Sequence, residues 1–115
     1  MSTALPMKDL LAVVTGAASG IGRATAQALS EQGARVVVAD IARDAGEAAA
    51  AALRERGLAA HFVAVDLTDA GSVERFAHEV QTAFGPVDIL VNGAGWGSTK
   101  PFWEGTPELW DKLVT

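Results

Sequence analysis

Apolar and polar positions divide the chain into two kinds of segment. Some short runs are continuously apolar and rich in β-branched residues, which is typical of parallel strands covered on both faces. We expect strands at residues 10–15, 35–40, 61–65 and 87–91. Between these runs, apolar residues recur at three- and four-residue intervals, as they do on one face of a helix. We expect helices at residues 20–32, at 43–56 and, after a cap at Thr68 or Asp69, up to a stop at Gly85-Pro86.

The same spacing predicts which side of each helix is buried. In the first helix the expected inner face consists of Ile21, Ala24, Ala28 and Leu29. In the second helix it consists of Ala45, Ala48, Ala49, Ala52 and Leu53. In the third helix it consists of Val73, Phe76, Ala77, Val80 and Phe84.

Strands that alternate with helices indicate an α/β fold, and right-handed crossovers make its sheet parallel. We therefore expect a Rossmann-type, doubly wound sheet that stops after about four strands, in the spatial order 3-2-1-4. The first two helices would cover one face and the third helix the other. A ligand would bind where the first and fourth strands lie side by side, at their carboxyl ends. A loop at residues 96–105 and a helix start at Thr106 are expected to follow.

A glycine-rich turn joins the first strand to the first helix. Gly16, Gly20 and Gly22 follow the spacing G-x3-G-x-G rather than the G-x-G-x-x-G of the usual dinucleotide fingerprint. Unpaired N–H groups at the helix start, together with the helix dipole, would suit a pyrophosphate. The alternative is a plain strand–helix connection. Asp40 favours the first interpretation, because it closes the second strand where a ribose-binding acid is expected, although it could also end that strand in solvent.

Composition and charge narrow the class of protein. The 115 residues suffice for one domain, and 50% hydrophobic with 20% charged residues indicates a globular chain. A net charge of −5 without a basic run argues against nucleic-acid binding. There is no cysteine, and His61 and His78 are isolated, so we expect no disulfide and no metal site. No signal peptide or membrane-length apolar run is present, so we expect a cytoplasmic protein without a membrane span.

These motifs together resemble the N-terminal, cofactor-binding part of the short-chain dehydrogenase/reductase family. The resemblance covers the chain from about Lys8 onward. It rests on the segment Thr15–Gly22, on Asp40, on Asp66-Leu67 and on the segment Leu90–Gly95.

The resemblance implies a role for each matching position. The residues that would hold the NAD pyrophosphate and the nearby ribose are Gly16, Ser19, Gly20, Ile21 and Gly22. Asp40 would accept hydrogen bonds from the adenosine ribose, and Asp66 and Leu67 would line the adenine pocket. The central part of the cofactor would be bordered by Asn92, Ala94 and Gly95, and Thr15 would tie the glycine turn to the fourth strand. Purely structural roles remain open for three of them: Ser19 as a helix cap, Asp66 as a turn residue and Asn92 as a brace of the sheet.

Two features refine the expected cofactor site. The family usually has asparagine where this chain has Gly93, which predicts a looser turn after the fourth strand. The Asp40 carboxylate would repel a 2′-phosphate, and neither Ser19 nor Ile41 is basic. We therefore expect NAD to be preferred over NADP.

The resemblance implies an oxidoreductase acting on an alcohol or ketone, and the loop around Trp96 faintly resembles members that act on hydroxyacyl thioesters. Family members use a serine, a tyrosine and a lysine for catalysis, and this chain has no tyrosine. We therefore expect no catalytic residue in residues 1–115, and we expect an inactive cofactor-binding part of a longer enzyme, paired with further copies or with a complementary chain. The alternatives are a non-catalytic nucleotide-binding module and a piece that works only with a complementary chain.

Overall fold

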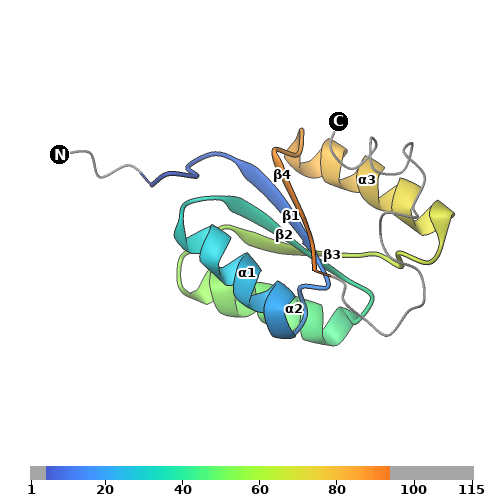
Figure 1. Ribbon diagram of the computed structural model, residues 1–115, viewed down its shortest axis with the longest axis horizontal. Helices are drawn as coiled ribbons and strands as arrows, with labels where there is room; N and C mark the ends of the chain where they lie inside the picture. The colour runs from blue at the N-terminus through green and yellow to red at the C-terminus, as the bar shows by residue number, and fades with distance from the viewer. Residues whose placement is uncertain (1–4, 94–115) are drawn as a thin grey trace.

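The structure is a computed structural model that describes residues 5–93. Ala94, Gly95, the loop expected at 96–105 and the helix start at Thr106 lie outside the described residues. Strands and helices alternate along the described part (Figure 1). The elements are β1 (Leu11–Thr15), α1 (Gly20–Glu31), β2 (Arg35–Asp40), α2 (Arg43–Glu55), β3 (Ala60–Ala64), α3 (Ala70–Phe84) and β4 (Ile89–Asn92). The predicted elements are confirmed, with boundaries that differ by one or two residues.

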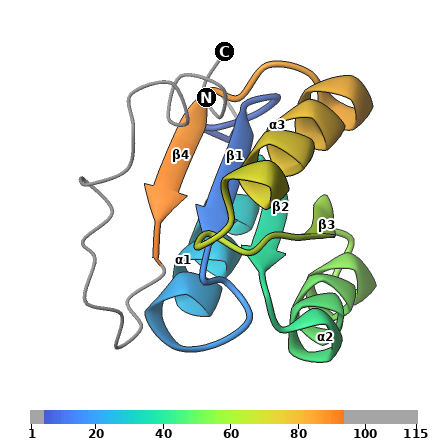
Figure 2. The same cartoon turned by 90° about the vertical axis from the view of Figure 1, so that its right-hand side faces the viewer.

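The four strands form one parallel sheet in the order β3-β2-β1-β4, which confirms the predicted topology (Figure 2). The central strand β1 pairs with β2 on one side, where Val13 lies opposite Val37. It pairs with β4 on the other side, where the same Val13 lies opposite Leu90. All five residues of β1 are buried, as expected for a strand covered on both faces. The carboxyl ends of β1 and β4 therefore lie side by side.

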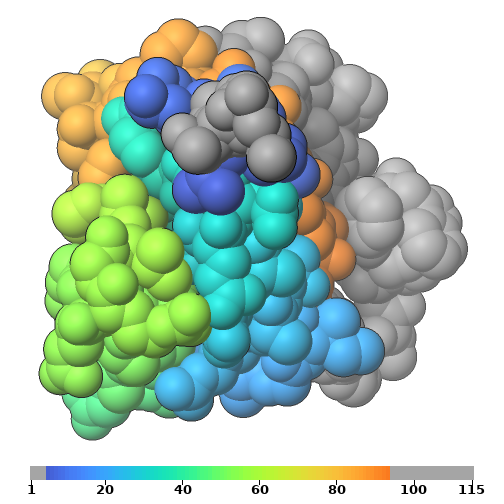
Figure 3. Space-filling model, turned by 90° about the vertical axis from the view of Figure 1, so that its left-hand side faces the viewer, coloured from blue at the N-terminus to red at the C-terminus, as the bar shows by residue number. Residues whose placement is uncertain are grey.

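The two faces of the sheet carry separate hydrophobic cores. Alternate residues of β1 and β2 point to opposite faces, so Val13 joins the core under α3 and Val14 joins the core under α1 and α2. Figure 2 shows α3 on the opposite side of the sheet from α1 and α2. Figure 3 shows α1 and the α2–β3 segment side by side on the other face. This arrangement confirms the expected distribution of the helices.

The predicted inner face is confirmed for α3 but is wrong in part for the other two helices. In α3, Val73, Phe76, Ala77 and Val80 are buried, and Phe84 packs against them. In α1 the buried residues are Gly22, Ala26 and Ser30, whereas Ile21, Ala24 and Ala28 are exposed. In α2 the buried residues are Gly46, Ala49, Ala50 and Leu53, whereas Ala45, Ala48 and Ala52 are exposed. Alanine occurs on every side of these two helices, so apolar spacing does not distinguish the buried face.

Gly46 explains how α2 approaches the sheet. A Cβ atom at this position would lie 2.1 Å from Cε1 of Phe62 on β3. The Phe62 ring therefore occupies the space that a side chain on α2 would need. Close packing of a ring against bare helix backbone fixes the rotation of α2 about its axis, and this explains why Ala45 faces solvent.

Asp88 fixes the pairing of β1 with β4. The Leu11 N–H donates to Oδ2 of Asp88 at 2.9 Å, and the Asp88 N–H donates to the Leu11 carbonyl oxygen at 2.9 Å. The two bonds set the register at the amino end of both strands. At the carboxyl end, Oγ1 of Thr15 donates to Oδ1 of Asn92 at 3.0 Å, as the expected tie between the glycine turn and the fourth strand requires.

Candidate functional site

A cavity of about 640 Å³ opens at the carboxyl end of the sheet. Residues from the loops after β1, β2, β3 and β4 line it. They are Gly16, Ser19, Gly20, Ile21, Asp40, Ile41, Val65, Asp66, Leu67, Thr68 and Gly93. Most of the predicted site residues thus surround one space, although they come from four separate parts of the sequence. Ala94 and Gly95 lie outside the described residues.

The glycines of the first turn serve two different purposes. Gly16 and Gly20 have φ angles of 64° and 61°, in the left-handed region where a side chain is disfavoured. Gly22 instead lies against the turn, because a Cβ atom on it would be 2.1 Å from the Gly16 carbonyl oxygen. Gly22 does not line the cavity itself. Instead, Gly22 lets the start of α1 pack directly against the turn whose residues line the cavity.

Ser19 is the N-cap residue of α1, but its side chain makes no capping hydrogen bond. The hydroxyl and the first N–H groups of α1 are therefore free to bind an anion at the cavity wall. Next to Ser19, the Ile21 side chain is 84% exposed although it is large and apolar. Ile41, which also lines the cavity, is 66% exposed. An apolar ligand group that contacted these side chains would remove them from water.

The Asp40 carboxylate is anchored by backbone groups. Oδ2 accepts a hydrogen bond from the Ala18 N–H at 3.0 Å, and Oδ1 accepts one from the Ala42 N–H at 3.0 Å. Each carboxylate oxygen has two acceptor positions, so both oxygens can accept a further bond from a ligand in the cavity. The sequence placed Asp40 at the site but gave no sign of its contact with the glycine turn.

Asp66 is held by the residues that follow it. Oδ1 accepts hydrogen bonds from the Thr68 hydroxyl at 2.6 Å and from the Thr68 N–H at 2.9 Å. The hydroxyl bond, with the backbone bond second, holds the pKa of the Asp66 carboxyl below its usual value. The cap of α3 is Asp69, whose Oδ1 accepts from the Gly71 and Ser72 N–H groups at 2.9 and 3.4 Å. Thr68 also lines the cavity. Nothing in the sequence indicated this role, because Thr68 stands between the acidic turn residues Asp66 and Asp69.

Gly93, which follows β4, lies close against the glycine-rich turn after β1. The Gly93 N–H donates to the Thr15 carbonyl oxygen at 3.1 Å. A Cβ atom on Gly93 would lie 2.7 Å from that oxygen and 3.2 Å from Cα of Gly22. Glycine at this position therefore permits a close contact with the first turn, while the rest of the turn after β4, for which a looser path was expected, lies outside the described residues. Beside it, Nδ2 of Asn92 is buried and has no hydrogen-bond partner among residues 5–93.

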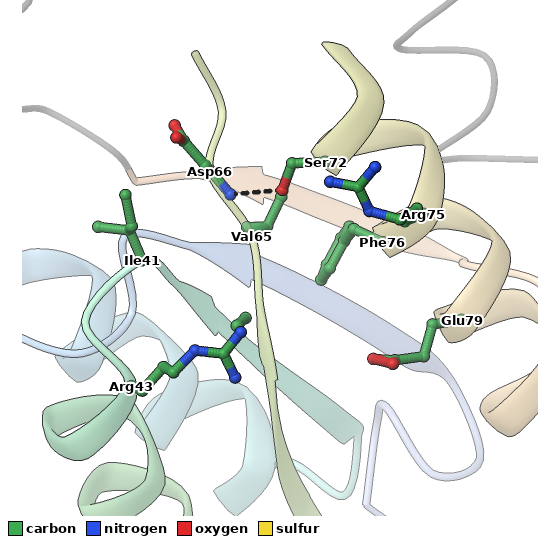
Figure 4. Close-up of a pocket in the computed structure, with 9 residues that line it drawn as sticks. Ile41, Arg43, Val65, Asp66, Ser72, Arg75, Phe76 and Glu79 are labelled. Atoms are coloured by element: carbon green, nitrogen blue, oxygen red, sulfur yellow. Dashed lines mark hydrogen bonds between the residues drawn. The ribbon is translucent and has the colours of Figure 1, made fainter. Parts of the chain in front are cut away.

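A second cavity of about 340 Å³ adjoins the first, and the two share Ile41, Val65 and Asp66. Figure 4 shows Arg43 and Glu79 pointing toward one another from α2 and α3, while the Asp66 carboxylate is turned away. Arg75 and Glu79, two charged residues of α3, line this cavity beside β3. Charged residues on an amphipathic helix give no sequence signal for such a place.

Within residues 5–93, no cluster of three or more His, Cys, Asp or Glu side chains is arranged to hold a metal ion. The helices described here are all too short or too polar to span a membrane.

Comparisons with known proteins agree on one family. The model described as short chain dehydrogenase matches residues 10–115. An uncharacterized oxidoreductase of Thermotoga maritima is 41% identical over 108 residues, which cover 94% of this chain and 42% of that protein. A cis-4-hydroxycyclohexanecarboxylate dehydrogenase of Sinomonas cyclohexanicum is 44% identical over 92% of this chain and 43% of its own length.

Among solved structures, a gluconate 5-dehydrogenase from Burkholderia cenocepacia, in complex with NADP and tartrate, is similar with a TM-score of 0.75. It is 30% identical, and the match covers 96% of this chain and 43% of that one. The chain therefore spans less than half the length of these relatives. A parallel sheet in the order β3-β2-β1-β4, a glycine turn packed against the start of α1 and this set of relatives lead to one conclusion. The chain belongs to the short chain dehydrogenase family.

Proposed function

We propose that this chain supplies the NAD-binding part of an oxidoreductase that acts on an alcohol or ketone. One observation carries the proposal: three neighbouring strands end at one cavity, and the residues at their ends suit three successive parts of the adenosine half of a dinucleotide. Gly16 follows β1, Asp40 ends β2 and Asp66 follows β3. These positions suit, in turn, a pyrophosphate, a ribose and a base.

The pyrophosphate would bind at the start of α1. The Ser19 hydroxyl is not used for capping, and the positive end of the helix dipole favours an anion there. Gly20 leaves open space beside the backbone, since nothing lies within 4 Å of the position of its absent Cβ atom. A side chain at Gly20 would fill the space through which phosphate oxygens reach the N–H groups.

The adenosine ribose would bind at Asp40, and this supports NAD rather than NADP as the cofactor. The carboxylate accepts hydrogen bonds from hydroxyl groups but repels a 2′-phosphate. Neither Ser19 nor Ile41, which line the same cavity as Asp40, is basic. The similar gluconate 5-dehydrogenase was solved with NADP, so cofactor preference has to be measured for this chain itself.

The substrate class follows from the relatives and from the chemistry of the cofactor. NAD accepts or donates a hydride, which interconverts an alcohol and a ketone. The relatives named above act on a ring alcohol and on a sugar acid by their names, and a hydroxyacyl thioester is a further candidate. The chain contains no tyrosine, so we assign it cofactor binding and no proton transfer.

The test is a pair of titrations of the 115-residue chain with NADH and with NADPH, followed by fluorescence. We expect NADH to bind more tightly. Asp40→Asn should reduce the preference by about tenfold, since a hydrogen bond to a charged group contributes about 1.5–3 kcal/mol. Glu55→Gln, on the exposed end of α2, is the charge-matched control and should change neither affinity. Equal affinities for both cofactors in the unchanged chain would refute the assignment of Asp40.

The alternative of a non-catalytic nucleotide-binding module predicts the same titration result, because neither hypothesis expects hydride transfer by this chain alone. The intact mass of the natural protein and the length of its open reading frame distinguish the two, since a longer protein favours the oxidoreductase. No binding of either dinucleotide would refute the proposed function for the chain by itself.

A further inference from the structure

The strand β3 has one edge that no other strand covers. Within residues 5–93 it pairs with β2 alone, so alternate residues turn their backbone groups away from the sheet. The Val36 N–H donates to the Ala59 carbonyl oxygen at 2.9 Å. The Val65 N–H donates to the Asp40 carbonyl oxygen at 3.1 Å. These two bonds, with the register of the strands, determine which residues of β3 face outward. They are Ala60, Phe62 and Ala64.

An arginine of α2 closes one end of this edge. Nη1 of Arg54 donates to the Ala60 carbonyl oxygen at 2.9 Å, which prevents a further strand from pairing there. Among residues 5–93, the outward N–H and C=O groups of Phe62 and Ala64 have no hydrogen-bond partner. The open part of the edge therefore offers both donors and acceptors at these two residues.

The cavity of about 340 Å³ lies along the open part of the edge. Ala64 lines it from β3, Arg43 from α2, and Arg75 and Glu79 from α3. In Figure 4 the chain that leads to Val65 runs between Arg43 on one side and Arg75 and Glu79 on the other. The three charged residues are exposed, and neither arginine belongs to the ion pairs found within residues 5–93. Free backbone groups and two arginines without an acidic partner thus share one groove.

We propose that this groove binds an extended, acidic peptide segment, which adds to the sheet as an antiparallel strand beside β3. Two residues of the segment, one opposite Phe62 and one opposite Ala64, exchange both of their backbone hydrogen bonds with them. The groove and its occupant involve no dinucleotide, so this inference is independent of the proposed function.

Side-chain direction and charge specify the segment. Phe62 packs toward the core under α1 and α2, so the two residues opposite Phe62 and Ala64 point to that same face. Arg43 reaches the cavity from α2, and acidic side chains at these two positions complement its charge. The residue between them points toward α3, where Arg75 and Glu79 carry opposite charges. An uncharged polar side chain suits that position.

A second copy of this chain fits the groove less well. If two β3 strands paired about Val63, Ala60 of one copy would lie opposite Asp66 of the other. Arg54, which is bound to Ala60, would then approach the end of the groove at which Arg43 of the other copy lies. Like charges would meet there, whereas an acidic segment meets opposite charge.

The experiment titrates the isotope-labelled 115-residue chain with the acetylated and amidated peptide Ser-Thr-Glu-Thr-Glu-Thr-Ser, followed by NMR. We expect slower amide hydrogen exchange at Phe62 and Ala64, because both N–H groups gain a partner. A peptide with lysine at both glutamate positions should bind about fivefold more weakly, which is the effect of one exposed ion pair. A peptide methylated on the backbone nitrogens of both glutamates should not bind, because it lacks the two donors.

Variants of the chain test the two parts of the groove. Ala64→Pro removes an outward N–H while the bonds to β2 remain, and it should abolish binding of the glutamate peptide. Arg43→Glu should weaken the glutamate peptide and strengthen the lysine peptide, by about fivefold each. Arg43→Glu leaves the backbone of β3 unchanged, so it tests the inference even if Ala64→Pro does not fold. Lys8→Glu, an exposed charge reversal before β1, is the control and should change neither affinity.

Several results would overturn the inference. Absence of binding at millimolar glutamate peptide would overturn it, and so would equal binding of the glutamate and lysine peptides or tight binding of the methylated peptide. Protection of Phe62 and Ala64 that rises with protein concentration, without any peptide, would assign the edge to a second copy instead. The titrations contain no dinucleotide, so none of these results bears on the proposed function.

Discussion

Oδ2 of Asp40 lies 3.0 Å from the Ala18 backbone nitrogen and accepts its hydrogen bond, so the end of β2 holds the glycine-rich turn after β1. The carboxylate that we assign to ribose recognition thus also supports the wall of the phosphate site. The bond between the Ala17 N–H and the Ala39 carbonyl oxygen, at 3.2 Å, reinforces the same connection. Substitution of Asp40 therefore affects two neighbouring parts of the cavity at once.

Asp40→Ala should lower the stability of the chain even without cofactor. The Ala18 N–H is part-buried and would lose its partner, and a lost hydrogen bond to a charged group costs about 1.5–3 kcal/mol. Asp40→Asn keeps an acceptor oxygen and should cost less. Urea unfolding of the three proteins measures the order. Equal stability of Asp40→Ala and the unchanged chain would show that the carboxylate does not support the turn.

Gly22→Ala should destabilise the protein and abolish dinucleotide binding. The added Cβ atom would meet the Gly16 carbonyl oxygen at 2.1 Å, and overpacking of this kind costs about 1–3 kcal/mol or more. Gly57→Ala is the control, because its φ of +81° imposes strain while nothing lies within 4 Å. It should lower stability by about 1–2 kcal/mol and leave NADH affinity unchanged. Similar NADH affinity in both variants would contradict the packing role of Gly22.

Gly46→Ala should reverse the usual effect of alanine in a helix. Alanine normally stabilises a helix interior by about 1 kcal/mol relative to glycine, but here the methyl group would overlap the Phe62 ring. We expect a loss of about 1–3 kcal/mol in the free energy of unfolding. Phe62→Leu should relieve the overlap, so the double variant should lose less than the sum of the single variants. Additive losses would rule out direct contact as the cause.

The pKa of Glu31 should depend on Arg56. Nη2 of Arg56 donates to Oε2 of Glu31 at 2.8 Å and, with Gln27 as a second donor, holds the pKa of Glu31 below its usual value. A carboxyl group with a lowered folded-state pKa stabilises the fold above its unfolded pKa. This contribution is lost as the pH falls through the folded-state value.

Arg56→Gln should therefore raise the pKa of Glu31 in an NMR titration. The effect on stability at neutral pH should be small, because both side chains are exposed to water and salt. Arg54→Gln, in the last turn of α2 and paired with Glu47, should leave the Glu31 pKa unchanged. A shift of equal size in both variants would point to a general charge effect.

The sequence predicted the sheet order because strands, turns and glycine stops all mark the same boundaries. It predicted the buried face of α3, where Val73 and Phe76 contrast with charged neighbours. The predicted buried face was wrong in part for α1 and α2, because alanine occurs both in the core and at the surface. The spacing of alanines therefore does not indicate which side of a helix is buried. Gly46, which fixes the orientation of α2, is a residue that apolar spacing ignores.

For the site, motif spacing identified the residues but not their contacts. Gly16, Asp40 and Asp66 come together because parallel strands end at one edge, which the predicted topology already implied. The bonds from Ala18 to Asp40 and from Thr68 to Asp66 depend on loop geometry that no spacing rule specifies. The close contact at Gly93 was missed for the same reason.

The central place of β1 has a consequence for the newly made chain. One edge of β1 has its partner once β2 has been synthesised, because Leu11 pairs opposite Arg35. Its other edge cannot pair with β4 until Asp88, which lies 77 residues beyond Leu11, has been synthesised. During that interval the backbone N–H and C=O groups on this side of β1 are unpaired and are flanked by the apolar side chains of Val13 and Val14, so the edge is a site for aggregation with other nascent chains. Slower synthesis before β4 would lengthen this exposure, and a chaperone that binds extended apolar segments would protect it.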